Sequence, residues 1–362
     1  MTTNASEAIL RDLYPAYGVE VPEEPAPGEP QPDQDDPFAQ FITGGSFILD
    51  VPEKTPAVWG RDGDVLWAEG EALIVCGPNG VGKTTIAGQL LAGRLGLMTT
   101  VLGLPVQAGT GRVLYLAMDR PQQAARALRR LFTPESRPVL DERLVVWKGP
   151  PPKDLAQNPA LLAQMCAHAG ADTVVVDSLK DAALKLSEDE AGAGWNRARQ
   201  AAITQGVQVL ELHHPRKSGS DGAGTPTLDS VYGSAWITAG AGSVVFLSGS
   251  AGDPVVKLTH LKQPSEEVGP FQILHDHDTG TSALYDSTDL LALVLATPGG
   301  MTAKQAASDV YDTENTKPAE VQKVRRRLEK YVKDGLLERV GDPNSKTAPV
   351  EYRAPSVAGG AR

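Results

Sequence analysis

Residues 77–85, Gly-Pro-Asn-Gly-Val-Gly-Lys-Thr-Thr, join two segments of different character. The residues before them, Ala72 to Cys76, are apolar and typical of a buried strand, whereas Thr84 to Leu97 has the pattern of a helix. A strand, a glycine-rich turn and a helix in this order are typical of parallel sheets that are covered by helices. This stretch therefore favours the α/β class before any other part of the chain is considered.

Further apolar runs of strand length alternate with helix-like stretches between about residue 60 and residue 285. They lie at residues 112–118, 144–147, 173–176, 207–212 and 243–247. Mostly apolar strands separated by helices indicate a mostly parallel sheet with helices on both faces. The pattern predicts an α/β domain over residues 46–285.

Residues 77–85 also fit the phosphate-binding pattern G-x-x-x-x-G-K-[ST]. In this pattern the glycines let backbone N–H groups surround phosphates, Lys83 reaches the β and γ phosphates, and the Thr84 hydroxyl binds Mg²⁺. Asp177 closes the apolar run 173–176 and is predicted to hold Mg²⁺ through water, although a strand-end aspartate can also cap a helix. ATP and Mg²⁺ are thus the predicted cofactors, and the predicted ATP-binding residues are Gly77, Pro78, Asn79, Gly80, Val81, Gly82, Lys83, Thr84 and Thr85.

A third strand ends in Ala117-Met-Asp-Arg-Pro121. With the phosphate loop and Asp177, this order of motifs resembles the RecA-like ATPases and, among them, the RepA-type hexameric helicase family related to the KaiC and DnaB groups. The resemblance covers roughly residues 60–285 and implies a RecA-like fold, ATP hydrolysis, a homohexamer and single-stranded DNA as a partner. In that family a glutamate activates the attacking water, so Asp119, one methylene shorter, is the implied catalytic residue. The alternative is that Asp119 caps a helix starting at Pro121.

Two histidines, His213 and His214, end the apolar run 207–212 and precede Pro-Arg-Lys. Neighbouring strand residues point to opposite faces, so the pair is poorly suited to share a metal ion. The resemblance implies that His214 reads the γ-phosphate and signals to a DNA-facing loop that contains Arg216 and Lys217. A histidine at the carboxyl end of a parallel strand points into the ligand crevice, which fits that role. A structural, hydrogen-bonded histidine and a plain surface loop are the alternatives.

The RepA-type family carries an arginine finger that reaches the neighbouring subunit's nucleotide. The corresponding segment of this chain, Ala239-Gly-Ala-Gly-Ser243, has no cation. Lys262, on a late strand, is the nearest substitute and is a candidate catalytic residue in trans. Otherwise Lys262 is merely solvated and hydrolysis is slow.

After residue 286 the pattern becomes helical and ends in short strand-like segments, which predicts a winged helix-turn-helix domain over residues 286–355 and a tail over 356–362. On the third helix, about 317–334, valines and a leucine recur on an inner face. Another face carries the candidate DNA-binding residues Lys323, Arg326, Arg327 and Lys330. Winged helices also serve as protein contacts, which is the alternative.

Composition excludes several other classes. Residues 18–37 are acidic and proline-rich, so residues 1–45 are predicted to be largely disordered. The net charge of -11 argues against a protein coated for nonspecific nucleic-acid binding. Cys76 and Cys166 read as core residues. We expect a cytoplasmic protein without a membrane partner, because no apolar run is long enough to span a bilayer and the first residues lack the pattern of a signal peptide.

Two functions remain open. The first is a RepA-like, helicase-like motor that moves on single-stranded DNA during plasmid or phage replication. The second is an ATP-switched DNA-binding regulator or replication initiator without unwinding activity. The order of motifs and the histidine pair favour the first, whereas Asp119 and the missing arginine finger favour the second.

Overall fold

The computed structural model of this 362-residue chain describes residues 41–216, 225–285, 290–311, 313–341 and 349–355. Internal contacts divide the chain between Glu53 and Lys54. In the first part, the short helix α2 (Gly44–Leu49) starts after Thr43, whose hydroxyl accepts a hydrogen bond from the Ser46 N–H. Most of the segment that the sequence predicts to be disordered, residues 1–40, lies outside the described residues.

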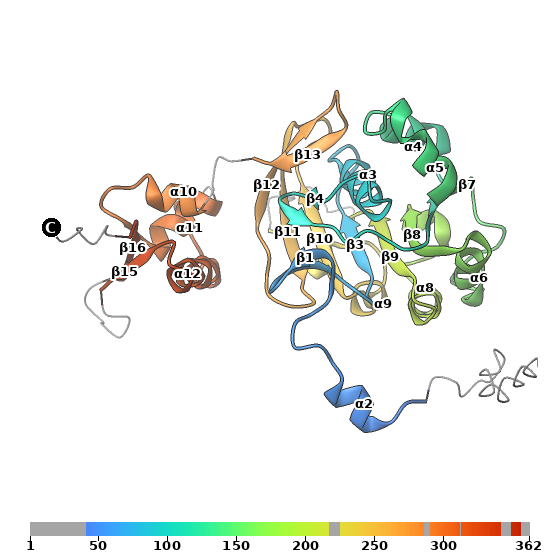
Figure 1. Ribbon diagram of the computed structural model, residues 1–362, viewed down its shortest axis with the longest axis horizontal. Helices are drawn as coiled ribbons and strands as arrows, with labels where there is room; N and C mark the ends of the chain where they lie inside the picture. Colours follow the sequence, from blue (N-terminus) through green and yellow to red (C-terminus); the bar gives the residue numbers. More distant parts are fainter. Residues whose placement is uncertain (1–40, 217–224, 286–289, 312, 342–348, 356–362) are drawn as a thin grey trace, which may run out of the picture. The chain divides into compact units, whose positions relative to one another are not determined.

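A nine-stranded sheet forms the centre of the α/β domain (Figure 1). Its strands follow the order β13-β12-β11-β10-β3-β9-β8-β6-β7. The strands from β10 to β7 are parallel, and β11, β12 and β13 extend the sheet in antiparallel fashion. Their bounds are β3 (Leu73–Cys76), β6 (Arg112–Ala117), β7 (Leu144–Lys148), β8 (Ala171–Asp177), β9 (Gln208–His213), β10 (Ser243–Ser248), β11 (Val255–Lys262), β12 (Phe271–Asp276) and β13 (Thr281–Leu284).

Helices cover both faces of the sheet, because side chains of each strand alternate between two apolar cores. On β6, Val113 and Tyr115 enter one core and Leu114 and Leu116 enter the other. The first core packs against α3 (Lys83–Arg94), α4 (Pro121–Leu128) and α5 (Arg137–Arg143). The second packs against α6 (Ala160–Ala169), α7 (Leu179–Ala182), α8 (Asp189–Thr204) and α9 (Ala235–Ala239). The predicted α/β class is confirmed.

The remaining elements of this domain are short. A hairpin of β1 (Ala57–Arg61) and β2 (Asp64–Ala68) buries Trp59 and Trp67, and β4 (Thr100–Val101) pairs with β5 (Leu104–Pro105). Two 3₁₀ turns are η2 (Pro134–Ser136) and η3 (Leu228–Ser230). Among the described residues, no helix combines the length and apolar character that crossing a bilayer requires.

The C-terminal residues have an apolar core of their own, which includes Leu290, Val324, Leu328 and Tyr352. Their elements are α10 (Leu290–Leu295), β14 (Met301–Thr302), α11 (Ala303–Tyr311), α12 (Pro318–Lys333), β15 (Glu338–Val340) and β16 (Glu351–Arg353), and the strands form a sheet of order β14-β16-β15. These elements fit the predicted winged helix-turn-helix domain, whose assignment to that class stays a prediction.

Candidate nucleotide-binding site

The phosphate loop, residues 77–84, connects the end of β3 to the start of α3. Gly80 and Gly82 have backbone φ angles of 77° and 90°, which disfavour residues with a side chain. The Gly77 N–H donates to the His213 carbonyl at 3.3 Å, and the Gly252 N–H donates to the Gly80 carbonyl at 3.2 Å. The loop is therefore held from the strands on both sides of β3.

Lys83 lies inside the curve of this loop. Its Nζ donates to the carbonyl oxygens of Gly77 at 2.6 Å and Pro78 at 2.7 Å. Burial lowers the pKa of Lys83 to about 8, although Cys76 and Asp177 oppose this shift. Because two neutral carbonyls compensate an ammonium poorly, phosphate oxygens would be stronger partners at this position.

Asp177 stands at the end of β8, on the sheet face that carries α3. The Tyr115 hydroxyl donates to its Oδ2 at 2.6 Å. Burial raises the pKa of Asp177, and the Tyr115 hydrogen bond and the Lys83 charge lower it less than burial raises it. Asp177 and Thr84 line one cleft of ≈ 370 Å³, together with Gly80, Lys83 and Thr85. A carboxylate and a hydroxyl in one phosphate cleft are oxygen ligands of the kind that Mg²⁺ prefers, so these residues fit that ion.

Asp119 lines the same cleft, two residues beyond the end of β6. Its Oδ2 lies 3.5 Å from Nε of Arg120, and its side chain is half exposed. The N-cap of α4 is Arg120, and no side chain caps this helix. Asp119 therefore does not have the capping role that was the alternative to catalysis.

His213 and His214 diverge as predicted from the period of a strand. His213 is buried, and its Nε2 donates to the Tyr232 carbonyl at 2.7 Å. His214 lines the phosphate cleft. Burial, followed by the charges of Lys83 and Lys180, lowers the pKa of His214 to about 4, so its imidazole is neutral at pH 7. His214 is the one of the two that can contact a phosphate.

The other predicted cations of this domain are engaged or lie elsewhere. Nη2 of Arg216 donates to the Gly233 carbonyl at 2.9 Å. Nζ of Lys262 donates to the carbonyls of Thr238 at 3.1 Å and Ala239 at 2.7 Å, at the end of α9. Lys217 lies outside the described residues. The DNA-binding role of Arg216 and the trans-acting role of Lys262 stay predictions.

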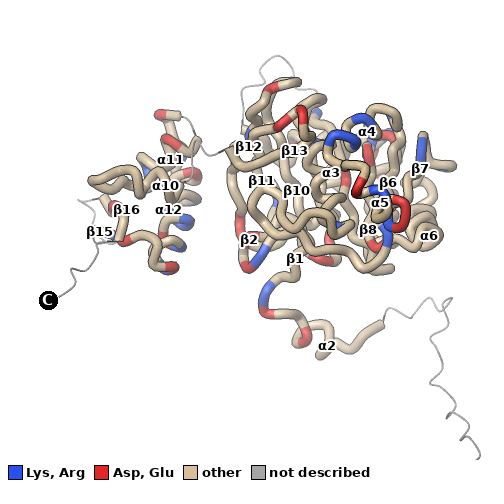
Figure 2. The backbone as a smooth tube through the Cα atoms, turned by 45° about the horizontal axis from the view of Figure 1, so that its top comes forward, with Lys and Arg blue, Asp and Glu red and all other residues tan. Residues whose placement is uncertain are grey.

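On α12, Arg326 and Lys330 are exposed and Arg327 is partly buried, whereas the side chain of Lys323 lies outside the described residues. Figure 2 shows the Lys and Arg positions along this helix. Their binding to DNA stays a prediction.

Sequence reasoning missed several residues of the cleft and its surroundings. Tyr115 shares its face of β6 with Ala117, and Asp119 follows two residues later, so this two-residue period could have identified Tyr115. Arg120 and Lys180 closely follow predicted residues. His275 and His277 also line the cleft, but nothing in the sequence around them indicates it, because they come from the antiparallel part of the sheet.

The phosphate loop, Asp177 and the mostly parallel sheet define a P-loop ATPase with a RecA-like fold. Residues 47–220 match the family model described as an AAA domain. Among solved structures, the chain is similar to a KaiC-like protein of the hyperthermophilic archaeon Pyrococcus horikoshii OT3, at 13% identity and a TM-score of 0.46. This match covers 65% of this chain and 100% of that chain. No curated protein matches the sequence.

Proposed function

We propose that the protein is a DNA-associated motor of the RepA-like kind, which hydrolyses ATP with Mg²⁺ as a homohexamer and acts on single-stranded DNA. The observation that carries this proposal is the position of His214. Its side chain lines the phosphate cleft, and His214 connects the end of β9 to Pro215 and Arg216, which precede segment 217–224.

In the proposed reaction, Lys83 and the loop N–H groups hold the phosphates, and Thr84 and Asp177 hold the metal ion. Bound Mg²⁺ would neutralise charge on the phosphates. Asp119 accepts a proton from the attacking water through its carboxylate. Lys180 and Arg120, which line the same cleft, add positive charge beside the phosphates.

His214 would couple this chemistry to DNA. A neutral imidazole can donate one hydrogen bond to a γ-phosphate oxygen, and this donor loses its acceptor after hydrolysis. The His214 carbonyl accepts from the Tyr232 N–H at 3.1 Å, and the Arg216 N–H donates to the Ser230 carbonyl at 2.8 Å. A displacement of His214 would therefore move residues on both sides of segment 217–224.

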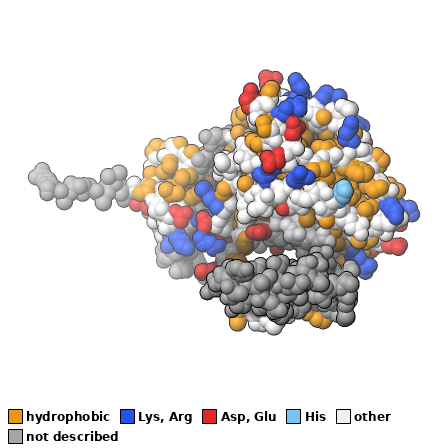
Figure 3. All heavy atoms as spheres, turned by 45° about the vertical axis from the view of Figure 1, so that its right-hand side comes forward, with side chains coloured by type: hydrophobic (Ala, Val, Ile, Leu, Met, Phe, Trp, Pro, Cys, Tyr) orange, Lys and Arg blue, Asp and Glu red, His pale blue; other side chains and the backbone are white. Residues whose placement is uncertain are grey.

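The DNA contacts of the proposal are Arg216, Lys217 and the exposed cations of α12. Figure 3 shows Lys and Arg side chains in several separate groups on one face of the α/β domain, with hydrophobic and acidic side chains between them. With a net charge of -11, binding to DNA would depend on such local groups, and it would weaken with added salt.

A second candidate is the ATP-switched DNA-binding regulator. The observation that favours it is the engagement of Lys262, whose ammonium group contacts the end of α9 in its own chain. Without a finger in trans, hydrolysis would be slow and nucleotide binding itself would be the signal.

The two candidates differ in an assay of ATP hydrolysis with and without single-stranded DNA, combined with the solution mass in a nonhydrolysable ATP analogue. The motor predicts stimulation by DNA and a ring. His214→Asn should retain ATP binding and lose the stimulation, whereas the control His277→Asn, from the same cleft, should retain both. If single-stranded DNA does not change the rate of hydrolysis and the protein forms no ring, the motor is excluded and the regulator remains.

A further inference from the structure

The antiparallel strands of the sheet reach the phosphate loop through His275, on β12. We propose that His275 is a positioning residue for this loop and that Ser282 and Gln89 fix its orientation. This inference rests on the proposed binding and hydrolysis of ATP.

The hydrogen bonds of His275 assign its tautomer. Its Nε2 lies 3.0 Å from the Val81 carbonyl oxygen, and its Nδ1 lies 2.7 Å from Oγ of Ser282. A carbonyl can only accept, so Nε2 carries the proton and donates to Val81. Burial lowers the pKa of His275, so the ring is neutral and Nδ1 accepts from the Ser282 hydroxyl.

Ser282, on β13, is bound in turn to the helix that follows the loop. Its N–H donates to Oε1 of Gln89 at 2.8 Å, and its carbonyl accepts from Nε2 of Gln89 at 3.2 Å. Gln89 belongs to α3 and is buried. A chain of hydrogen bonds therefore connects the loop through His275 and Ser282 to α3, the helix that directly follows the loop in the sequence. A shift of the loop would disturb the hydrogen bonds to its own helix.

The phosphate loop also packs closely against the imidazole ring of His275 at Gly82. A Cβ atom added to Gly82 would lie 2.2 Å from Cε1 and Nε2 of His275, so no side chain fits at this position while the ring is in place. The ring therefore packs directly against the backbone of Gly82.

The contact with Val81 determines where a phosphate-binding group points. The peptide bond between Val81 and Gly82 is trans, so its C=O and N–H point in opposite directions. By holding the Val81 carbonyl on the side of the β12–β13 hairpin, His275 turns the Gly82 N–H away from that hairpin. A loop N–H that is fixed before the ligand arrives binds phosphate without an ordering cost.

The test compares ATP affinity and turnover in full-length His275→Phe, His275→Gln and wild-type protein. Phenylalanine retains a ring but cannot donate, whereas the glutamine amide can donate from nearly the position of Nε2. Loss of one such hydrogen bond predicts ATP affinity reduced about 3- to 10-fold in His275→Phe, with a substantial recovery in His275→Gln. Ser282→Ala, which removes the partner of Nδ1, should weaken ATP binding by a smaller factor.

Thermal unfolding of the same variants separates positioning from packing. A merely structural ring would make His275→Gln, which loses the ring, the less stable and the weaker ATP binder of the two. Positioning predicts that His275→Gln binds ATP more tightly than His275→Phe whatever their order of stability. A His275→Gln protein that binds ATP no more tightly than His275→Phe would overturn the inference.

A matched control is His260→Phe on β11. His260 is also buried, bonds to Oγ of Ser243 at 2.9 Å and accepts from the Val268 N–H at 3.4 Å, with no contact to the loop. Its ATP affinity should equal that of the wild type. Failure of the wild type to bind ATP would overturn the proposed function along with this inference, whereas wild-type affinity in His275→Phe would overturn the inference alone.

Discussion

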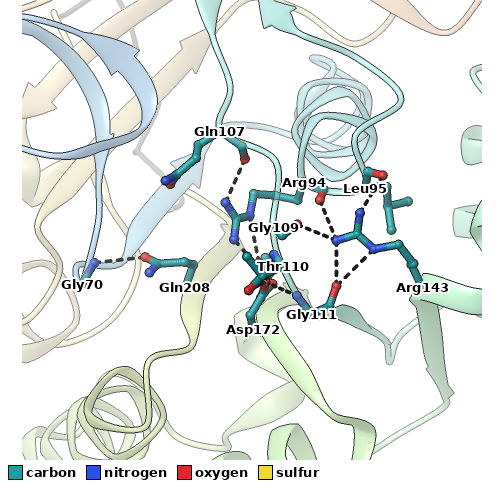
Figure 4. Close-up of polar contacts among 11 residues, drawn as sticks. Gly70, Arg94, Leu95, Gln107, Gly109, Thr110, Gly111, Arg143, Asp172 and Gln208 are labelled. Atoms are coloured by element: carbon teal, nitrogen blue, oxygen red, sulfur yellow. Dashed lines mark hydrogen bonds and ion pairs between the residues drawn. The ribbon is translucent and has the colours of Figure 1, made fainter.

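The two edges of the parallel sheet both carry buried or partly buried ionisable side chains, but these side chains have different partners. At the carboxyl edge, Lys83, Asp177 and His214 line one cleft. At the amino edge, Arg94, Arg143 and Asp172 are bound to groups of the same chain (Figure 4). Both sets lie on the face of the sheet that carries α3, whose first residue is Lys83 and whose last is Arg94.

The amino edge satisfies each of its charges with fixed partners. Arg143 donates to the carbonyls of Gly109 at 2.7 Å, Gly111 at 2.8 Å and Leu95 at 3.1 Å. Oδ2 of Asp172 accepts from the N–H groups of Thr110 and Gly111, both at 2.6 Å. These charge-assisted hydrogen bonds join the loop before β6 to the start of β8 and contribute to stability.

The carboxyl edge gives its ionisable groups fewer hydrogen-bond partners than the amino edge gives Arg143 and Asp172. The Lys83 ammonium donates to two neutral carbonyls. Burial lowers the pKa values of Lys83 and His214 and raises that of Asp177, so each shift favours the neutral form of the group. Perturbed groups that converge in a cleft are typical of functional sites. Substitutions at the carboxyl edge should therefore change activity, and substitutions at the amino edge should change stability.

Lys83→Ala should have the largest effect on activity. Removal of the ammonium that would contact the phosphates is expected to reduce ATP turnover about 100- to 1,000-fold, measured as phosphate release. Because the Lys83 ammonium donates to carbonyls of its own loop, the free energy of unfolding should change by less than about 1 kcal/mol in a denaturant titration. Normal turnover in this variant would refute the assignment of the carboxyl edge as the nucleotide site.

Arg143→Met should produce the reverse result. The loss of the donor to four carbonyls should lower the free energy of unfolding by about 2 kcal/mol, while turnover per folded molecule is unchanged. Arg137→Met is the control on the same helix, because Arg137 has only an exposed contact at 3.6 Å to Asp141 and should change stability by less than about 0.5 kcal/mol. Equal effects of the two variants would contradict the role of the amino edge.

Tyr115→Phe tests whether Tyr115, which does not line the cleft, affects Mg²⁺ binding through its hydrogen bond to Asp177. The variant keeps the packing and loses the hydrogen bond to Asp177, so the Mg²⁺ concentration that gives half-maximal activity should rise about 3- to 10-fold. That hydrogen bond lowers the pKa of Asp177, so the acidic limb of kcat/KM should move to higher pH in the variant. An unchanged Mg²⁺ requirement and pH profile would make Tyr115 a packing residue only.

How much could be predicted from the sequence also differs between regions. The parallel strands were predicted because each is a continuous apolar run, and Asp119, Asp177 and His214 were placed at their carboxyl ends by position alone. The structure brings these three into one cleft with Lys83. Strand direction predicted that residues at these strand ends lie together, whereas the resemblance to the RecA-like ATPases singled out Asp119 and His214.

The antiparallel strands and the amino edge could not be predicted in this way. His275 contacts a loop almost two hundred residues earlier in the chain, and its position depends on the pairing of β11 with β12, which no local pattern specifies. Arg143 and Asp172 read as ordinary surface charges, because their partners are backbone groups whose positions depend on the completed fold.

Asp172→Asn should give the smallest effect and a dependence on pH. Burial raises the pKa of Asp172, but hydrogen bonds from Gly111 and Thr173, the charge of Arg94 and the Thr110 N–H outweigh it, so the pKa is lowered from 3.8. A lowered folded-state pKa contributes stability above the unfolded-state value and loses it as pH falls through the folded-state value. The free energy of unfolding of the wild type should therefore exceed that of the variant by about 1 kcal/mol at pH 7, and this difference should shrink below about pH 4. Urea titrations at several pH values measure this, with the exposed Asp141→Asn as control. If the difference in unfolding free energy stays constant as the pH is lowered below about 4, the Asp172 charge does not stabilise the amino edge.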